Sequence, residues 1–580
     1  MKKLQGISAS PGIVIGKVFL YLDENLKIPK YKISSSQIQT EYSRFMEAIE
    51  KAKDELNDLK HNSTSEIRDE DVKFLDSHLL MVNDPELFKK IETDLKEKKY
   101  NIEWILYDAI ENFIDKLNRS EESYFRERTI DFVDVSRRVL NHLLYRERIS
   151  LSDLQEEVIL VAHDLLPSDA LQMNKRFVKG IAMDAGGKTS HTAILARSFE
   201  IPAVLGLSSI VDTVENGDPI IVDGNSGIVI INPDEETKHR YINTWHEWQK
   251  RELKLQTLNA LPAETRDGKL IALNANIEVP EEIDSVLSHG SDGIGLFRSE
   301  FLFLQPQGLS SEDDQFEHYV KVIKGMAGKS VTIRTLDVGG DKIIPDLDDL
   351  NEKNPILGWR AIRFCLSRRD IFKIQLRALL RASIYGNLRI MFPLISGGEE
   401  LDQIIEFLEE VKSELIKEGI EFDTKVPIGI MIEVPSAALI SDILAKRVNF
   451  FSIGTNDLIQ YTIAVDRGNE RIAYLYEPFH PGVLRLIKMT CENAHKNGIP
   501  VSMCGEMAGD PIASVILLGL GLDELSMTPF GIPEIKRIIR SIYLSEAEEL
   551  VGTIMEMRSH QEINDYVIGW LNERFDFINV

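Results

Sequence analysis

The sequence has no run of 18 or more apolar residues, so it predicts no segment that crosses a membrane. Cysteine is scarce, because Cys365, Cys491 and Cys504 are the only three in 580 residues. An odd, sparse set argues against a disulfide framework and suits a reducing compartment. The opening residues, Met1 to Gly6, lack the apolar core of a secretory signal peptide. We therefore expect a cytoplasmic protein without membrane insertion.

Two further absences narrow the possible partners and cofactors. No Gly-x-x-x-x-Gly-Lys-Ser/Thr loop occurs, and the domains predicted below leave no length for an ATP-binding domain. ATP is therefore not expected as a phosphate source. Basic residues are fewer than acidic ones, 67 against 93, which gives a net charge of −26. This argues against nucleic acid or anionic lipid as the main partner and favours a basic protein partner.

Hydrophobic periodicity predicts a helical bundle near the start of the chain. Residues 6–21 have the pattern of a turn and then a strand rich in β-branched side chains. After residue 34 the apolar residues recur at alternating gaps of four and three, as on one face of a helix. These residues are Ile38, Tyr42, Phe45, Ile49, Ala52, Leu56 and Leu59. We predict first strands over 1–25 and a bundle over 30–148.

The segment from Asp76 to Pro85 allows two interpretations. Leu79, Met81 and Val82 fit the packed core of the bundle. The same stretch also contains a histidine and acids, so a docking surface for a protein partner is the alternative.

A small α/β domain is predicted over residues 150–232, with short strands punctuated by turns. The strand left over at the start of the chain is expected to join its sheet. Residues 233–261 follow as a mostly polar helical linker, a pattern typical of a semi-rigid connector about which domains move.

Within this domain the stretch Gly186-Gly-Lys-Thr-Ser-His-Thr192 precedes the apolar run from Ala193 to Arg197. The glycines permit a sharp turn, and Thr189 or Ser190 can cap the helix that the run predicts. His191 would then lie in the first helical turn, where backbone N–H groups favour an anion. Two readings remain open here: a structural turn with a capping histidine, or a nucleophile that accepts a phosphoryl group.

The second half, residues 262–580, alternates short apolar strands with long helices. The predicted strands lie near 270–276, 293–297, 331–336, 388–393, 427–433, 450–453, 500–504 and 524–527. Eight such units match a (β/α)8 TIM barrel, with an open doubly wound sheet as the competitor. The fold class is therefore multidomain α/β.

In such a barrel the functional side chains follow the carboxyl ends of the strands. The polar residues at those positions are Arg298, Arg334, Lys342, Arg360, Glu433, Asn456, Asp457, Arg467 and Cys504. Arginine forks recognise phosphate and carboxylate oxygens, and two carboxylates without histidines suit Mg²⁺. The substrate is therefore predicted to be a small phospho-carboxylate, with Cys504 as an acid or as a buried apolar group.

Over both of its halves, the sequence closely resembles the enzyme I family of bacterial phosphoenolpyruvate–sugar phosphotransferase systems. The matching motifs run from end to end: Gly6-Ile-Ser-Ala-Ser-Pro-Gly12, Gly186 to Thr192, Asp337-Val-Gly-Gly-Asp-Lys342, Asn354-Pro-Ile-Leu-Gly-Trp-Arg360, Phe451-Ser-Ile-Gly-Thr-Asn-Asp457 and Met503-Cys-Gly-Glu506. Pyruvate phosphate dikinase and its relatives share the histidine and barrel motifs but add an ATP-grasp domain. This chain has the helical bundle instead.

The resemblance implies a phosphoenolpyruvate–protein phosphotransferase. The substrate would bind in the barrel with Mg²⁺ held by Glu433 and Asp457, and His191 would accept the phosphoryl group through its ε nitrogen. The residues implied to bind substrate are Arg298, Arg334, Lys342, Arg360, Asn456, Asp457 and Arg467. Cys504 would protonate the leaving enolate to release pyruvate.

The resemblance also implies partners. Phospho-His191 would pass its group to a histidine of the carrier protein HPr, as the first step of sugar uptake. The implied HPr surface on the bundle comprises His78, Leu80, Met81 and Glu86. The barrel is expected to form a homodimer. Two alternatives stay open: a dikinase-type small-molecule phosphotransferase, and a regulatory protein that binds phosphoenolpyruvate without turnover.

Overall fold

The structure is a computed structural model. It describes residues 1–21, 28–62, 78–79, 81–83, 85–118, 134–144, 151, 154–165, 173, 176–187, 191–199, 201–303, 310–338, 354–466, 469 and 471–575. The chain divides into two compact units, Met1–Gln249 and Lys250–Val580. No helix within these described ranges is long and apolar enough to cross a membrane.

The first unit contains an eight-stranded sheet in the order β1-β8-β7-β3-β4-β5-β6-β2. Its strands are β1 (Lys2–Gln5), β2 (Ile7–Ser10), β3 (Ile13–Tyr21), β4 (Val158–Ala162), β5 (Val178–Met183), β6 (Ala203–Leu205), β7 (Pro219–Asp223) and β8 (Ile228–Ile231). The start of the chain joins this sheet, because β3 pairs with both β4 and β7. Residues 6–21 were predicted to form a turn and then one strand, which is incomplete. Those residues form two strands, β2 and β3, separated at Pro11 and Gly12, where proline lacks an N–H donor and glycine has a φ of 116°.

Gly6 shows that this sheet curls back on itself. It is the single residue between β1 and β2, which lie at opposite edges of the sheet. The two edges must therefore approach within the reach of one residue. A Cβ on Gly6 would lie 2.5 Å from the carbonyl oxygen of Leu205, so only glycine fits this crossing.

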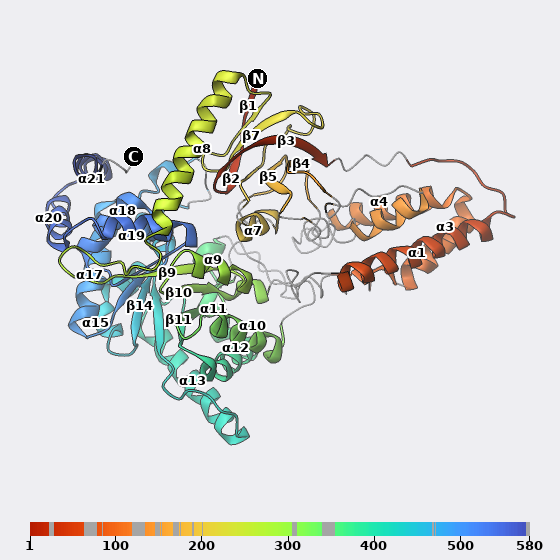
Figure 1. Cartoon of the computed structure of the whole chain (residues 1–580). Coiled ribbons are helices and arrows are strands. Elements are labelled where there is room, and N and C mark those ends of the chain that lie inside the picture. The colour runs from red at the N-terminus through yellow and green to blue at the C-terminus, as the bar shows by residue number, and fades with distance from the viewer. Residues whose placement is uncertain are drawn as a thin grey trace. The chain divides into compact units, whose positions relative to one another are not determined.

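The predicted bundle is helical in its described residues. Its helices include α1 (Ile38–Asn62), α3 (Pro85–Lys98) and α4 (Ile102–Asn118), which pack side by side (Figure 1). The apolar stripe of α1 faces inward, since Phe45, Ile49, Ala52 and Leu56 are all buried. The three-and-four spacing placed these residues on one face, and burial of that face holds the helices together.

The linker is one long helix, α8 (Glu235–Gln256), and the boundary between the two compact units falls inside it. Part of this helix packs on the first unit, unlike a connector that is exposed along its whole length. Tyr241 and Trp245 on its first half pack against Ile13, Ile221 and Ile230 of the sheet. The first half of α8 therefore belongs to the first unit.

The second unit is a closed barrel of eight parallel strands, as predicted. They are β9 (Ala272–Ile277), β10 (Gly293–Arg298), β11 (Ser330–Arg334), β12 (Leu388–Phe392), β13 (Ile428–Ile432), β14 (Phe450–Ile453), β15 (Val501–Met503) and β16 (Glu524–Met527). β16 pairs with β9, which closes the ring and excludes the open doubly wound sheet.

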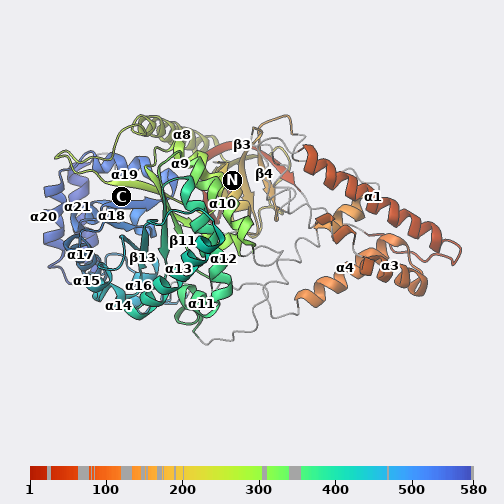
Figure 2. The same cartoon turned by 90° about the horizontal axis from the view of Figure 1, so that it is seen from below.

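Helices cover the outside of the ring of strands (Figure 1, Figure 2). They are α9 (Ile283–Ser288), α10 (Glu312–Gly325), α11 (Ala361–Ser367), α12 (Arg369–Ala382), α13 (Gly398–Glu418), α14 (Pro435–Leu439), α15 (Ser441–Leu444), α16 (Thr455–Ile463), α17 (Pro481–Lys496), α18 (Pro511–Leu520), α19 (Ile532–Ile539), α20 (Leu544–Ile554) and α21 (His560–Arg574). A separate apolar cluster combines strand residues with one that follows a strand: Leu296, Met391, Met431, Phe450 and Cys504. Apolar side chains thus fill part of the inside of the barrel, as is typical of this fold.

Candidate active site

Polar side chains gather where several barrel strands end. Arg298 and Arg334 are the last residues of β10 and β11 and are partners in the register of these strands. Glu433 directly follows β13, Cys504 directly follows β15, and α16 begins with Thr455, Asn456 and Asp457 just beyond β14. Because the strands are parallel, their carboxyl ends share one rim, which brings these residues together.

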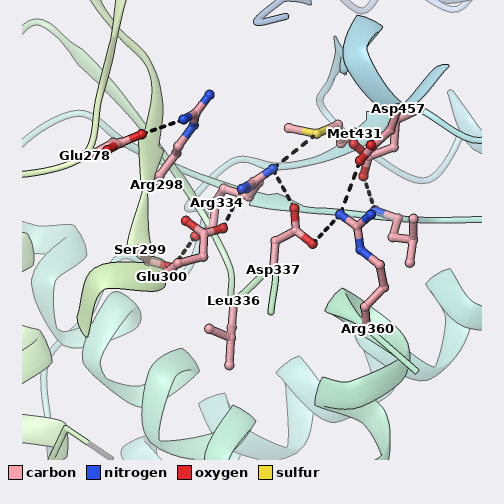
Figure 3. A network of polar contacts seen from close by, with 12 residues as sticks. Glu278, Arg298, Ser299, Glu300, Arg334, Leu336, Asp337, Arg360, Met431 and Asp457 are labelled. Carbon is pink, nitrogen blue, oxygen red and sulfur yellow. Dashed lines mark hydrogen bonds and ion pairs between the residues drawn. The ribbon is translucent and has the colours of Figure 1, made fainter. Parts of the chain in front are cut away.

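A network of arginines and carboxylates occupies this rim (Figure 3). Arg334 forms ion pairs with Glu300 and, at 2.9 Å, with Asp337. The other oxygen of Asp337 accepts from Arg360, again at 2.9 Å. Arg360 also reaches Asp457 at 3.2 Å. One carboxylate therefore holds two buried guanidinium groups side by side.

The arginines in this network are fixed as cations. Burial would lower the pKa of Arg334, but the charges of Glu300 and Asp337 outweigh burial and raise it. The pKa of Arg360 is raised in the same way, chiefly by Asp337 and Asp457. Their carboxylate partners also hold these two guanidinium groups in fixed positions at the rim.

Asp337 was not among the site residues predicted from the sequence, although it lies in one of the matched motifs. The available signal was physical: two arginines at a buried rim require counterions, and Asp337 stands three residues after Arg334. Glu300, two residues after Arg298, is a second counterion that was not among the predicted site residues.

We predict that Asp337→Asn destabilises the barrel by about 3 kcal/mol, because it removes the carboxylate shared by two buried guanidinium groups and leaves each with one counterion. The matched control is Asp370→Asn, which removes a carboxylate from a pair with Arg368 at 2.8 Å on the surface. That change should cost less than about 1 kcal/mol. Hydrogen exchange of the barrel strands in urea separates barrel unfolding from that of the first unit. Equal, small losses in both variants would contradict the prediction.

The buried side-chain amide of Gln375 binds the backbone segments next to this network. The Gln375 side chain accepts a hydrogen bond from the backbone N–H of Leu336 at 2.9 Å and donates to the hydroxyl of Ser299 at 3.0 Å. Ser299 in turn donates to the carbonyl of Arg334 at 2.7 Å. Gln375 and Ser299 are completely buried. Helix α12 thus fixes the two strand ends that carry Arg298 and Arg334.

Glu433 is a buried acid of the rim with a strongly perturbed pKa. Burial, followed by the charges of Asp457 and Asp337, raises the pKa of its carboxyl to about 8. One of its oxygens accepts from the backbone N–H of Leu394 at 2.6 Å. A Cβ on Gly454 would lie 2.8 Å from the other oxygen, so a side chain at this position would displace the carboxyl group.

The charges of the rim suit a divalent cation. Two guanidinium groups, Arg334 and Arg360, face four carboxyl groups, Glu300, Asp337, Glu433 and Asp457. Two negative charges are in excess when all are ionised. In the described part of the chain no cluster of three or more His, Cys, Asp or Glu side chains has the geometry of a metal site. Mg²⁺ is often held by only one or two carboxylates, because water and substrate phosphates supply the other ligands.

Cys504 lies at the mouth of the barrel with its thiol protonated. Burial raises the pKa of this thiol. Its backbone is held on both sides: the N–H of Cys504 donates to Ile453 at 3.1 Å, and Asn276 donates to its carbonyl at 3.0 Å. A neutral thiol in a fixed position can donate a proton to a carbon atom placed before it.

Asn456 is locked to the segment after Cys504. Its amide group and Glu506 exchange two hydrogen bonds, each of 3.2 Å. Gly505 allows this close approach, because a Cβ there would lie 1.7 Å from the hydroxyl of Thr455. The hydrogen bonds between Asn456 and Glu506 therefore hold the segments after β14 and β15 together, and glycine at position 505 lets them approach closely.

His191 is the first residue of α7 (His191–Ser198), which follows β5 through a glycine turn. Gly186 has a φ of 97°, a conformation that glycine adopts without strain. Ala193 and Ala196 are completely buried, and α7 packs on β2. Helix α7 is thus held against the edge of the sheet formed by β2 and β6. The proposed caps, Thr189 and Ser190, lie outside the described residues.

The remaining predicted residues are placed only in part. Lys342, Arg467 and Leu80 lie outside the described residues, and Glu86 is described only as part of α3. His78 is buried and Met81 is half-buried. The side chain of His78 is therefore not on the surface in this structure. The assignment of these residues to a docking surface stays a prediction.

Comparison with known proteins gives consistent matches along the chain. Three family models match: "PEP-utilising enzyme, N-terminal" over residues 5–128, "PEP-utilising enzyme, mobile domain" over 154–227 and "PEP-utilising enzyme, PEP-binding domain" over 252–544. A phosphoenolpyruvate-protein phosphotransferase of Priestia megaterium is 44% identical over 566 residues, which is 98% of each chain. That of Bacillus subtilis strain 168 is 45% identical over 567 residues, covering 98% of this chain and 99% of the relative.

A solved structure titled as an NMR solution structure of Enzyme I (nEIt) is 40% identical and covers 42% of this chain and 99% of that one. Its TM-score of 0.38 is too low for the superposition to carry an argument.

Proposed function

This chain belongs to the family of phosphoenolpyruvate-protein phosphotransferases, and from that premise we propose how its residues carry out the transfer. The barrel rim binds phosphoenolpyruvate, His191 accepts its phosphoryl group, and the carrier protein HPr receives that group in turn. The observation that carries this proposal is the pair of buried arginines bridged by Asp337 at the rim of the barrel.

The substrate carries a phosphate and a carboxylate close together, so it requires several positive groups in a small space. Arg298, Arg334 and Arg360 supply them from neighbouring segments of the rim, and Asn456 adds a neutral amide. Planar guanidinium groups bind both kinds of oxyanion in bidentate fashion. We assign Lys342 and Arg467 to the same substrate, on the motif resemblance alone.

Mg²⁺ would be held by Glu433 and Asp457. The excess of negative charge at the rim and the raised pKa of Glu433 support this assignment, because a bound cation would keep that buried carboxyl ionised. When bound, the ion draws charge away from phosphate and enolate oxygens.

In this proposal His191 takes up the phosphoryl group and Cys504 protonates the product that is left. The ε nitrogen of His191 attacks phosphorus, the bond from phosphorus to the enol oxygen breaks, and its electron pair remains on that oxygen. Fixed guanidinium charges stabilise the enolate that forms. The Cys504 thiol gives its proton to the methylene carbon, and pyruvate leaves.

The phosphoryl transfer requires a conformational change. His191 belongs to the first compact unit and the arginines belong to the second, so the units must meet for transfer and part for delivery. We assign the hinge to the second half of α8. The first half is packed on the sheet by Tyr241 and Trp245, whereas the unit boundary follows at Gln249.

The acceptor of the second step is a histidine of HPr, docked on residues 30–148 near Met81. The negative charge of the chain, −26, favours a basic partner. We further propose that the chain works in the cytoplasm and forms a homodimer through its barrel, which sedimentation at several concentrations tests.

The proposed function is tested by incubating the chain with phosphoenolpyruvate, Mg²⁺ and purified HPr, followed by mass spectrometry of both proteins. Both are expected to gain one phosphoryl group, with HPr labelled only when this chain is present. A chain that gains no mass, or that requires a nucleotide to do so, would overturn the assignment and favour the dikinase-type alternative.

A further inference from the structure

Arg298 differs in its surroundings from Arg334 and Arg360, the two other rim arginines that the structure describes. The side chains of Arg334 and Arg360 are 9% and 13% exposed, and each contacts at least two carboxylates. The side chain of Arg298 is 40% exposed, and among the described residues it pairs with one carboxylate, Glu278, at 2.5 Å. Figure 3 shows this pair beside the main network. Of these three described arginines, Arg298 is therefore the one most able to change its partner.

The position of Glu278 is set by the barrel itself. Ile277, the last residue of β9, is the register partner of Phe297 in β10. The next residues along the two parallel strands are Glu278 and Arg298, so their side chains leave the rim next to each other. The backbone N–H of Glu278 also donates to the carboxylate of Glu282 at 2.7 Å, which anchors this turn. The pair is thus built into the register of the fold.

An arginine that binds a substrate phosphate cannot at the same time give its full charge to a carboxylate. A phosphate that enters must either displace Glu278 from Arg298 or bind beside a second negative charge. Both routes weaken binding of the substrate. No other role of Glu278 is evident from its contacts, since its carboxylate meets no further cation among the described residues.

We propose that Glu278 is an affinity-determining residue: a resident anion that competes with the phosphate of the substrate for Arg298. This inference rests on the proposed function and adds a residue that sets the KM. Glu278 touches no reacting atom and acts through Arg298 alone. It opposes the bound substrate and the transition state alike, so it raises KM and leaves kcat unchanged.

The test compares Glu278→Gln with the wild-type chain in steady-state transfer from phosphoenolpyruvate to HPr. Because both members of the pair are partly exposed, water screens their interaction, and KM should fall about threefold with kcat unchanged. The inhibition constant of inorganic phosphate should fall by a similar factor. Glu278→Ala is a second variant that removes the same charge.

The matched control is Glu281→Gln, which removes a carboxylate three residues away that pairs with Lys321 at 2.9 Å. It should leave KM unchanged, which separates competition for Arg298 from a general change in charge. In an Arg298→Ala background, Glu278→Gln should lose most of its effect on KM.

Loss of a merely structural residue would not make the substrate bind more tightly. A fall in KM in the Glu278 variants would therefore indicate competition for Arg298. An unchanged KM in both Glu278 variants would overturn the inference, as would a raised KM with lower kcat, which would mean that Glu278 orients Arg298 for binding. If the wild-type chain itself gains no phosphoryl group from phosphoenolpyruvate, the proposed function fails, and that failure is seen before any variant is compared.

Discussion

Replacement of His191 by alanine is expected to abolish phosphorylation of the chain by phosphoenolpyruvate. The reason is chemical, since the side chain supplies the only nitrogen proposed to bond phosphorus. The fold should persist, because alanine is the best helix former and position 191 begins α7. Mass spectrometry after incubation with phosphoenolpyruvate and Mg²⁺ measures the loss directly. HPr should also remain unphosphorylated in the presence of this variant.

The control for this variant is His239→Ala, at an exposed position of α8. It should be phosphorylated to the same extent as the wild-type chain. The bond formed in the wild type should be labile in acid and stable in base, as expected for a phosphorus–nitrogen linkage. Label retained by His191→Ala with that behaviour would place the acceptor at another histidine and refute the assignment.

The second large effect is expected at Cys504. Cys504→Ala removes the proposed proton donor, so pyruvate release should slow by a factor of about 10² to 10⁴, the usual range for a lost general acid. The thiol is suited to this task because burial raises its pKa and keeps it protonated. Asn276 holds the carbonyl of the same residue in place. A coupled assay for pyruvate, run in parallel with mass spectrometry of His191, separates protonation from phosphoryl transfer.

Two other cysteines provide the comparison. Cys365 and Cys491 are also buried, but they lie within helices α11 and α17 and not directly after a barrel strand. Their alanine variants should release pyruvate at the wild-type rate, apart from any loss of stability. If Cys504→Ala also released pyruvate at that rate, the thiol would be a packing residue and the proton would come from another group.

Much of the architecture was predictable from the sequence because it is local. The three-and-four spacing of Phe45, Ile49, Ala52 and Leu56 predicts a buried helix face, and all four are buried. The eight apolar strands of the second half predict a barrel, and each forms at the expected place. Arg334, the last residue of β11, and Glu433, directly after β13, lie at strand ends, which is where the sequence placed them.

The partners of those residues could not be predicted in the same way. Asp337 bridges two arginines that are 26 positions apart in sequence, and Gln375 reaches the site from the outer helix α12. Glu278 meets Arg298 only because β9 and β10 pair in one register. The curl that joins β1 to β2 through Gly6 likewise depends on contacts across the whole sheet.

The sequence by itself determined the elements, the eight strand–helix units of the second half, the catalytic candidates and, through its motifs, the family, whereas the pairing of β16 with β9 showed that the barrel is closed. Periodicity and strand-end position are properties of a short stretch of chain, so they are visible without the fold. Only the tertiary structure decided which charges neutralise each other, because a counterion is chosen by distance in space. That choice leaves Arg334 and Arg360 fixed and buried, and Arg298 exposed beside a carboxylate that competes for it.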